Sequence, residues 1–208
     1  MQGRGKLAAV MASALWFLAA CSGGGGDSGG GDPTSSGLSG NFTADVSPIC
    51  PNSAVDTLSL RKANVLGRIV TVGLQVTDCD SSLGVYGVNF DLRFNPAIVQ
   101  CPSLNPCAPG TLLTSPLATS TPQCTCDNQA GTLLGTFTKK FPGVNDVISP
   151  GGSKDIVVIT LNVTDQGASR VDFAGTGSLN GSALVTLSNN SPQAIPGLNY
   201  AGGSVTGQ

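Results

Sequence analysis

The chain has 208 residues, enough for one domain with additional segments, and only 11% of them are charged. All twelve acidic residues are aspartate, and the sequence contains neither histidine nor glutamate. These absences exclude Ser-His-Asp and Cys-His catalysis, H-E-x-x-H metal sites and zinc sites with imidazole ligands. Glycine is abundant, with 29 residues, and no long 3.6-residue apolar period occurs after residue 20, so the composition predicts an all-β fold.

The N-terminal segment has the features of a signal peptide. Arg4 and Lys6 precede residues 7–20, an apolar run that is shorter than the about 20 residues needed to cross a bilayer. The run ends in Leu-Ala-Ala-Cys at residues 18–21, which resembles the lipobox of bacterial lipoproteins. This resemblance implies cleavage before Cys21 and attachment of acyl chains to it. The alternative is an ordinary signal peptide with a chance cysteine.

A flexible tether follows, because residues 22–40 consist mainly of glycine and serine. We therefore expect a signal peptide at 1–20, a tether at 21–40 and a folded domain at 41–208. Cys21 is followed by Ser22 instead of Asp. In a lipoprotein of this type, a serine there implies a location in the outer membrane, with the domain on the periplasmic or the external side. Cleavage leaves eight basic and twelve acidic residues, a charge of −4, which excludes a typical nucleic-acid-binding surface.

The folded part contains an even number of cysteines, which in an exported protein predicts three disulfides. Residues 56–62 and 69–77 read as the two strands of a hairpin. Extending both strands away from the turn brings Cys50 opposite Cys79, which favours that pair. The six cysteines are Cys50, Cys79, Cys101, Cys107, Cys124 and Cys126.

The other four cysteines form two close pairs in the sequence. Cys124 and Cys126 are too close to bridge each other without strain, so both should bond to the segment 101–107. Which cysteine bonds to which stays open. A zinc site made of four thiolates is the alternative, but the spacing within each pair differs from the usual two to four residues.

Strand patterns continue to the end of the chain, broken by proline and glycine. About eight or nine short strands with turn signals predict a two-sheet antiparallel β-sandwich or jelly roll. Beyond the first hairpin, the expected strands lie near residues 85–96, 131–140, 155–165, 170–175, 182–188 and 202–207.

The clearest pattern is "VYGVNFDLRFNP" at residues 85–96. One parity carries apolar side chains and is predicted to face the core. These residues are Val88, Phe90, Leu92 and Phe94, and Tyr86 shares their parity. The other parity, Gly87, Asn89, Asp91 and Arg93, is predicted to face away from the core.

The order of these patterns resembles that of cohesin domains over about residues 55–207. "VYGVNFDLRFNPAIVQ" is similar to the third cohesin strand and the segment after it, and "DTLSLRKANVLGRIVTVGLQV" to the first two strands. "GGSKDIVVITLNVTD" and "NYAGGSVTG" are similar to a later strand and the closing strand. The resemblance implies a jelly-roll sandwich related to cellulose-binding modules. The cysteine-rich insertion at 101–126 departs from the cohesin pattern.

Cohesins bind a calcium-loaded partner protein, dockerin, on one sheet face to which the third strand contributes polar residues. The resemblance therefore implies a partner-binding site at Asn89, Asp91 and Arg93, in a non-catalytic, lipid-anchored module of polysaccharide-degrading assemblies. Asn89 matches a position where cohesins often have Asp, and Gly87 one where they often have Asn, so the chain departs there. Thr160 and Asn162 are expected on a nearby strand.

Other functions stay open. Carbohydrate binding on a flat face normally uses exposed aromatic rings, but only Tyr86 and Tyr200 remain as Tyr or Trp after the signal peptide is removed. A structural envelope lipoprotein without a specific ligand is a further alternative. Asp78 and Asp80 form the closest acidic pair, in a spacing that lacks the remaining positions of a calcium loop. We therefore expect no enzyme activity, no cofactor and no metal site, although calcium binding near Asp78 and Asp80 stays open.

Overall fold

The computed structural model describes residues 37–46, 50, 55–113, 123–139 and 144–208. The expected signal peptide, the lipidation site Cys21 and nearly all of the tether lie outside these ranges. In the described part of the chain, no helix is long and apolar enough to cross a membrane.

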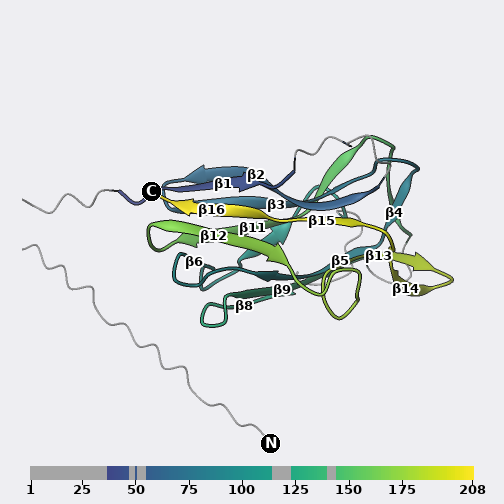
Figure 1. Ribbon diagram of the computed structural model, residues 1–208. Coiled ribbons are helices and arrows are strands. Elements are labelled where there is room, and N and C mark those ends of the chain that lie inside the picture. The colour runs from purple at the N-terminus through teal and green to yellow at the C-terminus, as the bar shows by residue number, and fades with distance from the viewer. Residues whose placement is uncertain (1–36, 47–49, 51–54, 114–122, 140–143) are drawn as a thin grey trace, which may run out of the picture. The chain divides into compact units, whose positions relative to one another are not determined.

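The architecture is a two-sheet antiparallel β-sandwich, as the sequence predicts (Figure 1). The front sheet contains eight strands: β1 (Gly40–Ala44), β16 (Gly203–Gly207), β12 (Gly167–Phe173), β5 (Gly87–Arg93), β13 (Ala183–Ser188), β14 (Ser191–Ala194), β9 (Thr132–Thr138) and β8 (Gln123–Asp127). The back sheet contains six: β15 (Asn199–Ala201), β2 (Thr57–Leu66), β3 (Ile69–Thr77), β11 (Ser153–Val163), β6 (Val99–Gln100) and β7 (Cys107–Pro109). A small pair joins β4 (Leu83–Val85) to β10 (Asp146–Ile148).

The expected hairpin of β2 and β3 is present, with Leu66 opposite Ile69 and the turn at Gly67. Gly67 has a φ of +55°, a conformation that glycine adopts without steric cost. Thr160 and Asn162 lie on β11 in the back sheet, so the expectation that they lie near the polar side chains of β5 is wrong. Strand alternation assigns residues to a face, but it does not assign a strand to one of two sheets.

The core lies between the two sheets and contains the apolar parity of residues 86–94. Val88, Phe90 and Leu92 are fully buried, and the Phe90 ring stacks on Phe137 of β9 with the ring centroids 6.2 Å apart. Gly135 stands opposite Phe90, and a Cβ on this glycine would lie 2.1 Å from Cζ of the Phe90 ring. The glycine in β9 therefore leaves the space that the Phe90 ring fills.

Strands β12 and β13 are two halves of one interrupted strand. Both pair with the same edge of β5, since β12 is in register with Leu92 and Arg93 and β13 with residues 87–89, while β9 occupies the other edge. Between the two halves, residues 174–182 leave the sheet. We call this segment the 174–182 loop. β5 is thus an inner strand of the front sheet, with one interrupted neighbour.

A partly buried ion pair crosses the outer surface of the back sheet. Arg61 on β2 donates from Nε and a terminal nitrogen to the two carboxylate oxygens of Asp155 on β11, and Gln75 donates to the same carboxylate. Gly73 lies between the two strands, and a Cβ there would stand 2.9 Å from Asp155 Oδ1. Gly73 of β3 therefore leaves room for the side chains of Arg61 on β2 and Asp155 on β11 to meet above it.

Replacing Arg61 by alanine is expected to lower the free energy of unfolding by about 1–3 kcal/mol, because the largely buried Asp155 carboxylate loses its cation. Arg93→Ala is the matched control: it breaks a pair in which the arginine is 55% exposed and should cost at most about 1 kcal/mol. Urea unfolding monitored by circular dichroism measures both values. Equal losses would contradict the assigned role of Asp155 burial.

Candidate functional site

The polar parity of β5 faces away from the core, but its residues differ in exposure. Arg93 is exposed, Asn89 and Asp91 are half-buried and Gly87 is buried. A terminal nitrogen of Arg93 lies 2.7 Å from Asp91 Oδ2, so the two charges form a pair on this face. The three residues predicted to bind a partner therefore share one surface, yet only Arg93 is freely accessible.

Gly87 has a structural role at the end of this face. A Cβ at this position would lie 2.6 Å from the carbonyl oxygen of Phe137 and 2.6 Å from Cγ2 of Thr138, both on β9. The backbones of β5 and β9 therefore leave no room for a side chain here. Glycine at position 87 therefore allows this close approach of the two strands.

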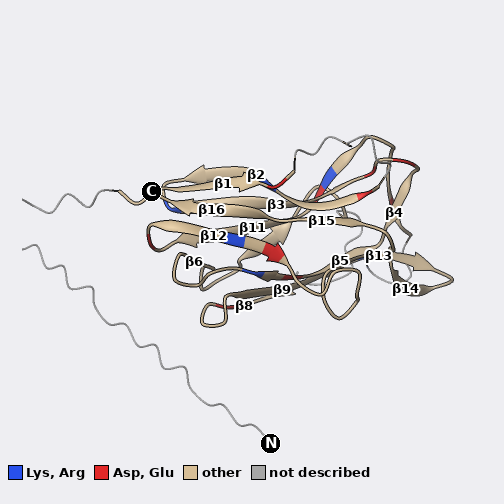
Figure 2. Cartoon of the chain, in the orientation of Figure 1, with Lys and Arg blue, Asp and Glu red and all other residues tan. Residues whose placement is uncertain are grey.

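The accessible part of the face lies over β9 and β8. Leu134 stands directly opposite Asp91 and is 47% exposed, and Thr136 stands opposite Asn89 and is also exposed. Thr125 of β8 continues the row beyond Leu134. No residue of β9 is charged (Figure 2). The exposed Leu134 therefore lies between Asp91 on one side and Thr125 on the other, with Thr136 two residues further along β9. We call Leu134, Thr136, Thr125 and Arg93 the open face.

The 174–182 loop covers the other part of the face. Asn89 Nδ2 donates to the carbonyl oxygen of Leu179 at 3.0 Å, which places the loop tip against the outward side of β5. At the loop base, the Asp91 amide donates to the hydroxyl of Ser182, and the Ala174 amide donates to the Asp91 carbonyl. The loop therefore touches two of the three predicted partner-binding residues.

Two side-chain oxygens on this face lack hydrogen-bond donors. Asn89 Oδ1 and Asp91 Oδ1 are both inaccessible to solvent, and neither has a partner among the described residues. Buried polar atoms are normally paired, and an unpaired acceptor costs the full free energy of its desolvation. The arrangement places two unsatisfied acceptors two residues apart beside the open face.

Two leucines near the site did not figure in the sequence-based prediction. Leu134 follows Leu133, and adjacent residues of a strand face opposite sides, so one of the two had to point outward. Leu179 is 43% exposed and stands alone among glycines and polar residues. Both signals are present in the sequence, but neither shows that the two residues flank β5.

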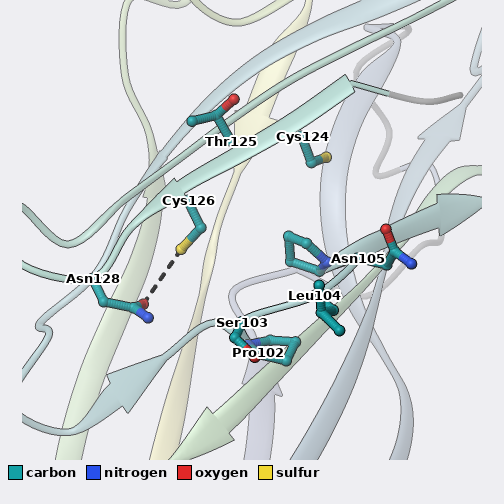
Figure 3. A pocket seen from close by; sticks show the side chains of 9 residues that line it. Pro102, Ser103, Leu104, Asn105, Cys124, Thr125, Cys126 and Asn128 are labelled. Carbon is teal, nitrogen blue, oxygen red and sulfur yellow. Dashed lines mark hydrogen bonds between the residues drawn. The ribbon is translucent and has the colours of Figure 1, made fainter.

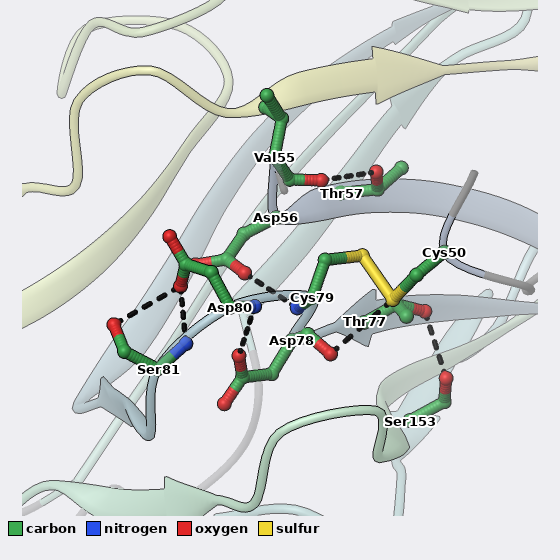
Figure 4. The surroundings of a disulfide bond; sticks show 10 residues. All are labelled: Cys50, Val55, Asp56, Thr57, Thr77, Asp78, Cys79, Asp80, Ser81 and Ser153. Atoms are coloured by element: carbon green, nitrogen blue, oxygen red, sulfur yellow. Dashed lines mark hydrogen bonds between the residues drawn. A yellow bond between two sulfur atoms is a disulfide. The ribbon is translucent and has the colours of Figure 1, made fainter. Parts of the chain in front are cut away.

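A second cluster of side chains lies at the start of β2 and the end of β3. One carboxylate oxygen from each of Asp56, Asp78 and Asp80 lies within 4.8 Å of the others (Figure 4). Asp56 already accepts from the Cys79 amide, and Asp78 accepts from the amides of Asp80 and Leu83. The buried Asp78 carboxylate thus holds the turn before β4.

Burial raises the pKa of the Asp56 carboxyl, and the neighbouring Asp78 and Asp80 charges add to the shift against the hydrogen bond from Cys79. The folded protein therefore binds this proton more tightly than the unfolded chain, so stability falls as pH rises through the carboxylate range. Asp56→Asn retains the oxygen that accepts from Cys79. It is expected to raise the free energy of unfolding at neutral pH by a few tenths to about 1 kcal/mol.

The measurement is a pair of thermal unfolding curves for wild type and Asp56→Asn at pH 7 and at pH 3, with a chelator present throughout. The gain should vanish at the lower pH, where the wild-type carboxyl is protonated as well. A gain that is the same at both values would contradict the electrostatic explanation.

The six cysteines form three disulfides. Cys50 bonds to Cys79, the pair that the hairpin argument favours, with Cα atoms 5.4 Å apart. The segment 101–107 is joined to β8 by Cys101–Cys126 and Cys107–Cys124. Because 101–107 runs between β6 and β7 of the back sheet and β8 is an edge of the front sheet, these two bonds connect the sheets. No thiolate cluster for zinc remains.

A cavity of about 400 Å³ lies between β8 and residues 102–106 (Figure 3). The side chains of Cys124 and Cys126 face it, and Leu104 stands at its rim with 79% exposure. Asn128 binds the backbone of Cys101 through both its amide nitrogen and its oxygen, which holds one end of the cavity. The lining has no acidic or basic group, so it offers no proton donor or acceptor for general acid–base chemistry.

No protein-family model and no curated protein matches the chain. A type II cohesin domain from the cellulosome of Acetivibrio cellulolyticus matches in structure, with a TM-score of 0.52 and 17% identity over 74% of this chain and 95% of the cohesin. A chain of a type II cohesin–X-dockerin complex from the same organism gives 0.51 and 14%, over 71% and 95%. The fold is cohesin-like.

The second type II cohesin module of the ScaA scaffoldin of A. cellulolyticus has a TM-score of 0.50 and 15% identity, with 73% of this chain and 94% of the module covered. At these identities the similarity shows the cohesin-like fold alone. The parallel pairing of β15 with β2 and the antiparallel order β13, β5, β9 and β8 define the two sheets of this cohesin-like sandwich.

Proposed function

We propose that this chain is a non-catalytic binding module that captures a dockerin-like protein on the front sheet. The observation that carries the proposal is the open face beside β5. There Leu134 offers an exposed apolar contact next to the Asp91–Arg93 pair. The cohesin-like fold supports the proposal, since one of the similar structures is a cohesin–dockerin complex.

An exposed leucine flanked by two threonines and a charge pair suits a protein partner, because interface energy concentrates in a few buried apolar contacts surrounded by polar groups. Arg93 of β5 and Asp127 of β8 lie at one end of this surface, on opposite sides of Thr132 of β9. The face is thus close to neutral, and contact area rather than net charge would determine affinity.

The chemistry of the described residues does not favour an enzyme. On the front sheet the outward carboxylate of β5, Asp91, is paired with Arg93, and that of β12, Asp172, is paired with Arg170. The aspartate cluster at Asp56 is held by backbone amides. None of these arrangements provides a nucleophile with an adjacent base. Polysaccharide binding on a flat face is the competing function. Among the described residues, Tyr86 is buried and Tyr200 half-buried, so no tyrosine is presented for stacking on a sugar ring.

The experiment uses the mature chain and the dockerin-like modules, with duplicated calcium loops, encoded by the same genome. Immobilised mature chain should capture at least one purified module in calcium and release it when the calcium is chelated. A genome without such modules, or no capture of any of them, would overturn the proposal. A glycan array probed with the same chain tests the competing function, and a specific signal there would favour polysaccharide binding.

We also propose that acyl chains on Cys21 anchor the module to the outer membrane, in the periplasm or on the surface, with the glycine-rich residues 22–40 as tether. The Leu-Ala-Ala-Cys motif supports this location. More than one acyl chain is needed for stable anchoring. Cys21→Ser should move the protein from the membrane fraction to the soluble fraction. A protein that stays soluble with Cys21 intact would contradict the anchor.

A further inference from the structure

The part of β5 that would meet a partner is covered by the chain itself. The 174–182 loop leaves the sheet between β12 and β13, and its tip accepts a hydrogen bond from Asn89 through the carbonyl oxygen of Leu179. Ala183 and Val185 of β13 stand opposite Asn89 and Gly87 of β5, so their side chains point to the same outward side. Ala183 and Val185 are nevertheless buried. The outward side is therefore covered around Asn89 and Ala183, while Arg93 of β5 and the outward side of β9 are open.

The neck of the loop is narrow and well fixed. Ser182 is fully buried, and its amide donates to the Gly175 carbonyl. Its hydroxyl accepts a hydrogen bond from the Asp91 amide, in the place of a backbone carbonyl of a neighbouring strand. Gly175 and Gly181 are in contact, because a Cβ on Gly175 would lie 3.2 Å from Cα of Gly181. These contacts hold the base of the loop whether or not its tip rests on β5.

The tip is held much more weakly. Within the described ranges, the hydrogen bonds from the tip to residues outside the loop are that from Asn89 to Leu179 and one of 3.1 Å from the Gly177 amide to the hydroxyl of Tyr200. Residues 175–180 are all exposed, and Gly175 and Gly177 both have positive φ. A tip with two hydrogen bonds and few packing contacts on a fixed neck can leave β5 without disturbing the sheet.

The covered state leaves hydrogen-bonding capacity unused. Asn89 Oδ1 and Asp91 Oδ1 are shielded from water and lack donors among the described residues, so the covered arrangement satisfies them poorly. Leu134 and Leu179 flank these two oxygens, the first directly opposite Asp91 and the second bonded to Asn89. A partner that displaces the tip and donates hydrogen bonds would satisfy both oxygens while it packs on Leu134.

We propose that the 174–182 loop is a displaceable cover over Asn89 and Asp91, and that the protein partner replaces it with a segment whose side chains donate hydrogen bonds to these two oxygens. This inference rests on the proposed function and adds the chemistry of the partner and the rearrangement that admits it. The partner presents donors next to an apolar side chain, and the loop tip competes with it for Asn89.

The cover can be tested without a partner. A cysteine is placed at Asp91, which keeps the bond from Asn89 to Leu179, in one variant and at Thr136, an exposed residue of β9, in another, and each is reacted with a maleimide. The Asp91→Cys thiol should react at least about tenfold more slowly than Thr136→Cys, because its labelling awaits movement of the tip. Removing residues 177–180, which leaves Thr136 and the neck in place, should bring the two rates together. Equal rates with the intact loop would overturn the cover.

Displacement is tested with the calcium-loaded dockerin-like module captured by the mature chain. Removal of residues 177–180 should strengthen its binding at least about threefold, since the competing tip is gone. Unchanged or weaker binding would show that the partner does not displace the loop, although the proposed function would stand. If no module binds either form, the proposed function fails and displacement fails with it, while the labelling rates still decide whether the loop covers this part of β5.

Discussion

Phe90→Ala is expected to lower the free energy of unfolding by about 3–5 kcal/mol. The Phe90 ring is buried between the sheets, stacked on Phe137 and lying against Gly135 of the neighbouring strand. Because β5 is paired on both sides, the surrounding structure cannot collapse fully into the space that the ring leaves. Chemical unfolding followed by circular dichroism measures the loss, and Leu134→Ala on the outer face is the control, expected within about 0.5 kcal/mol of wild type.

A double-mutant cycle with Gly135 makes this prediction sharper. Gly135→Ala alone should cost about 1–3 kcal/mol, because its methyl group would overlap the Phe90 ring. In the Phe90→Ala background the same methyl group enters an empty space and should cost much less. Costs that simply add would show that the ring and the glycine do not contact each other as described.

Removing one of the two disulfides between the sheets is expected to lower the free energy of unfolding by about 3 kcal/mol. Cys101–Cys126 and Cys107–Cys124 close loops with sequence separations of 25 and 17 residues, and both tie β8 to the back sheet. The Cys101→Ser/Cys126→Ser variant tests one bond and Cys107→Ser/Cys124→Ser the other. Each keeps four of the six cysteines of the folded part, and mass analysis after alkylation should find none of these four free.

Both cysteines of a disulfide are replaced together in these variants, so neither variant leaves one of them as an unpaired thiol. Similar losses for the two pairs are expected, since the loops differ little in length. A stability equal to that of wild type in both variants would contradict the connection between the sheets. Six free thiols in the purified mature protein would contradict all three disulfides.

Much of the sandwich was predictable from local pattern. Strands β2, β3, β5 and β11 alternate apolar and polar side chains along their length, and the structure confirms each of them. β8 was not predicted, because its inward side chains are Cys124 and Cys126, which read as disulfide partners rather than as a strand face. Short strands such as β15, whose pairing with β2 is parallel and distant in sequence, also lack a local signal.

The candidate site was predictable only in part. Alternation in β5 placed Asn89, Asp91 and Arg93 on one outward face, which the structure confirms as geometry. The cover over Asn89 depends on the interruption between β12 and β13, where the buried hydroxyl of Ser182 binds Asp91 across 91 residues. Such a long-range contact leaves no periodic pattern. The alternation of β11 likewise does not show which sheet the strand joins, so Thr160 was expected near β5, although it lies on the opposite sheet.

The most direct test of partner capture on the front sheet compares two matched substitutions in the mature chain. Leu134→Asp places a charge at the centre of the open face, and Thr160→Asp places the same charge on the back sheet. Isothermal titration with the captured dockerin-like module should show affinity reduced at least about tenfold, or about 1.4 kcal/mol, for Leu134→Asp and unchanged for Thr160→Asp. Full affinity of Leu134→Asp, with loss in Thr160→Asp, would contradict the front-sheet site.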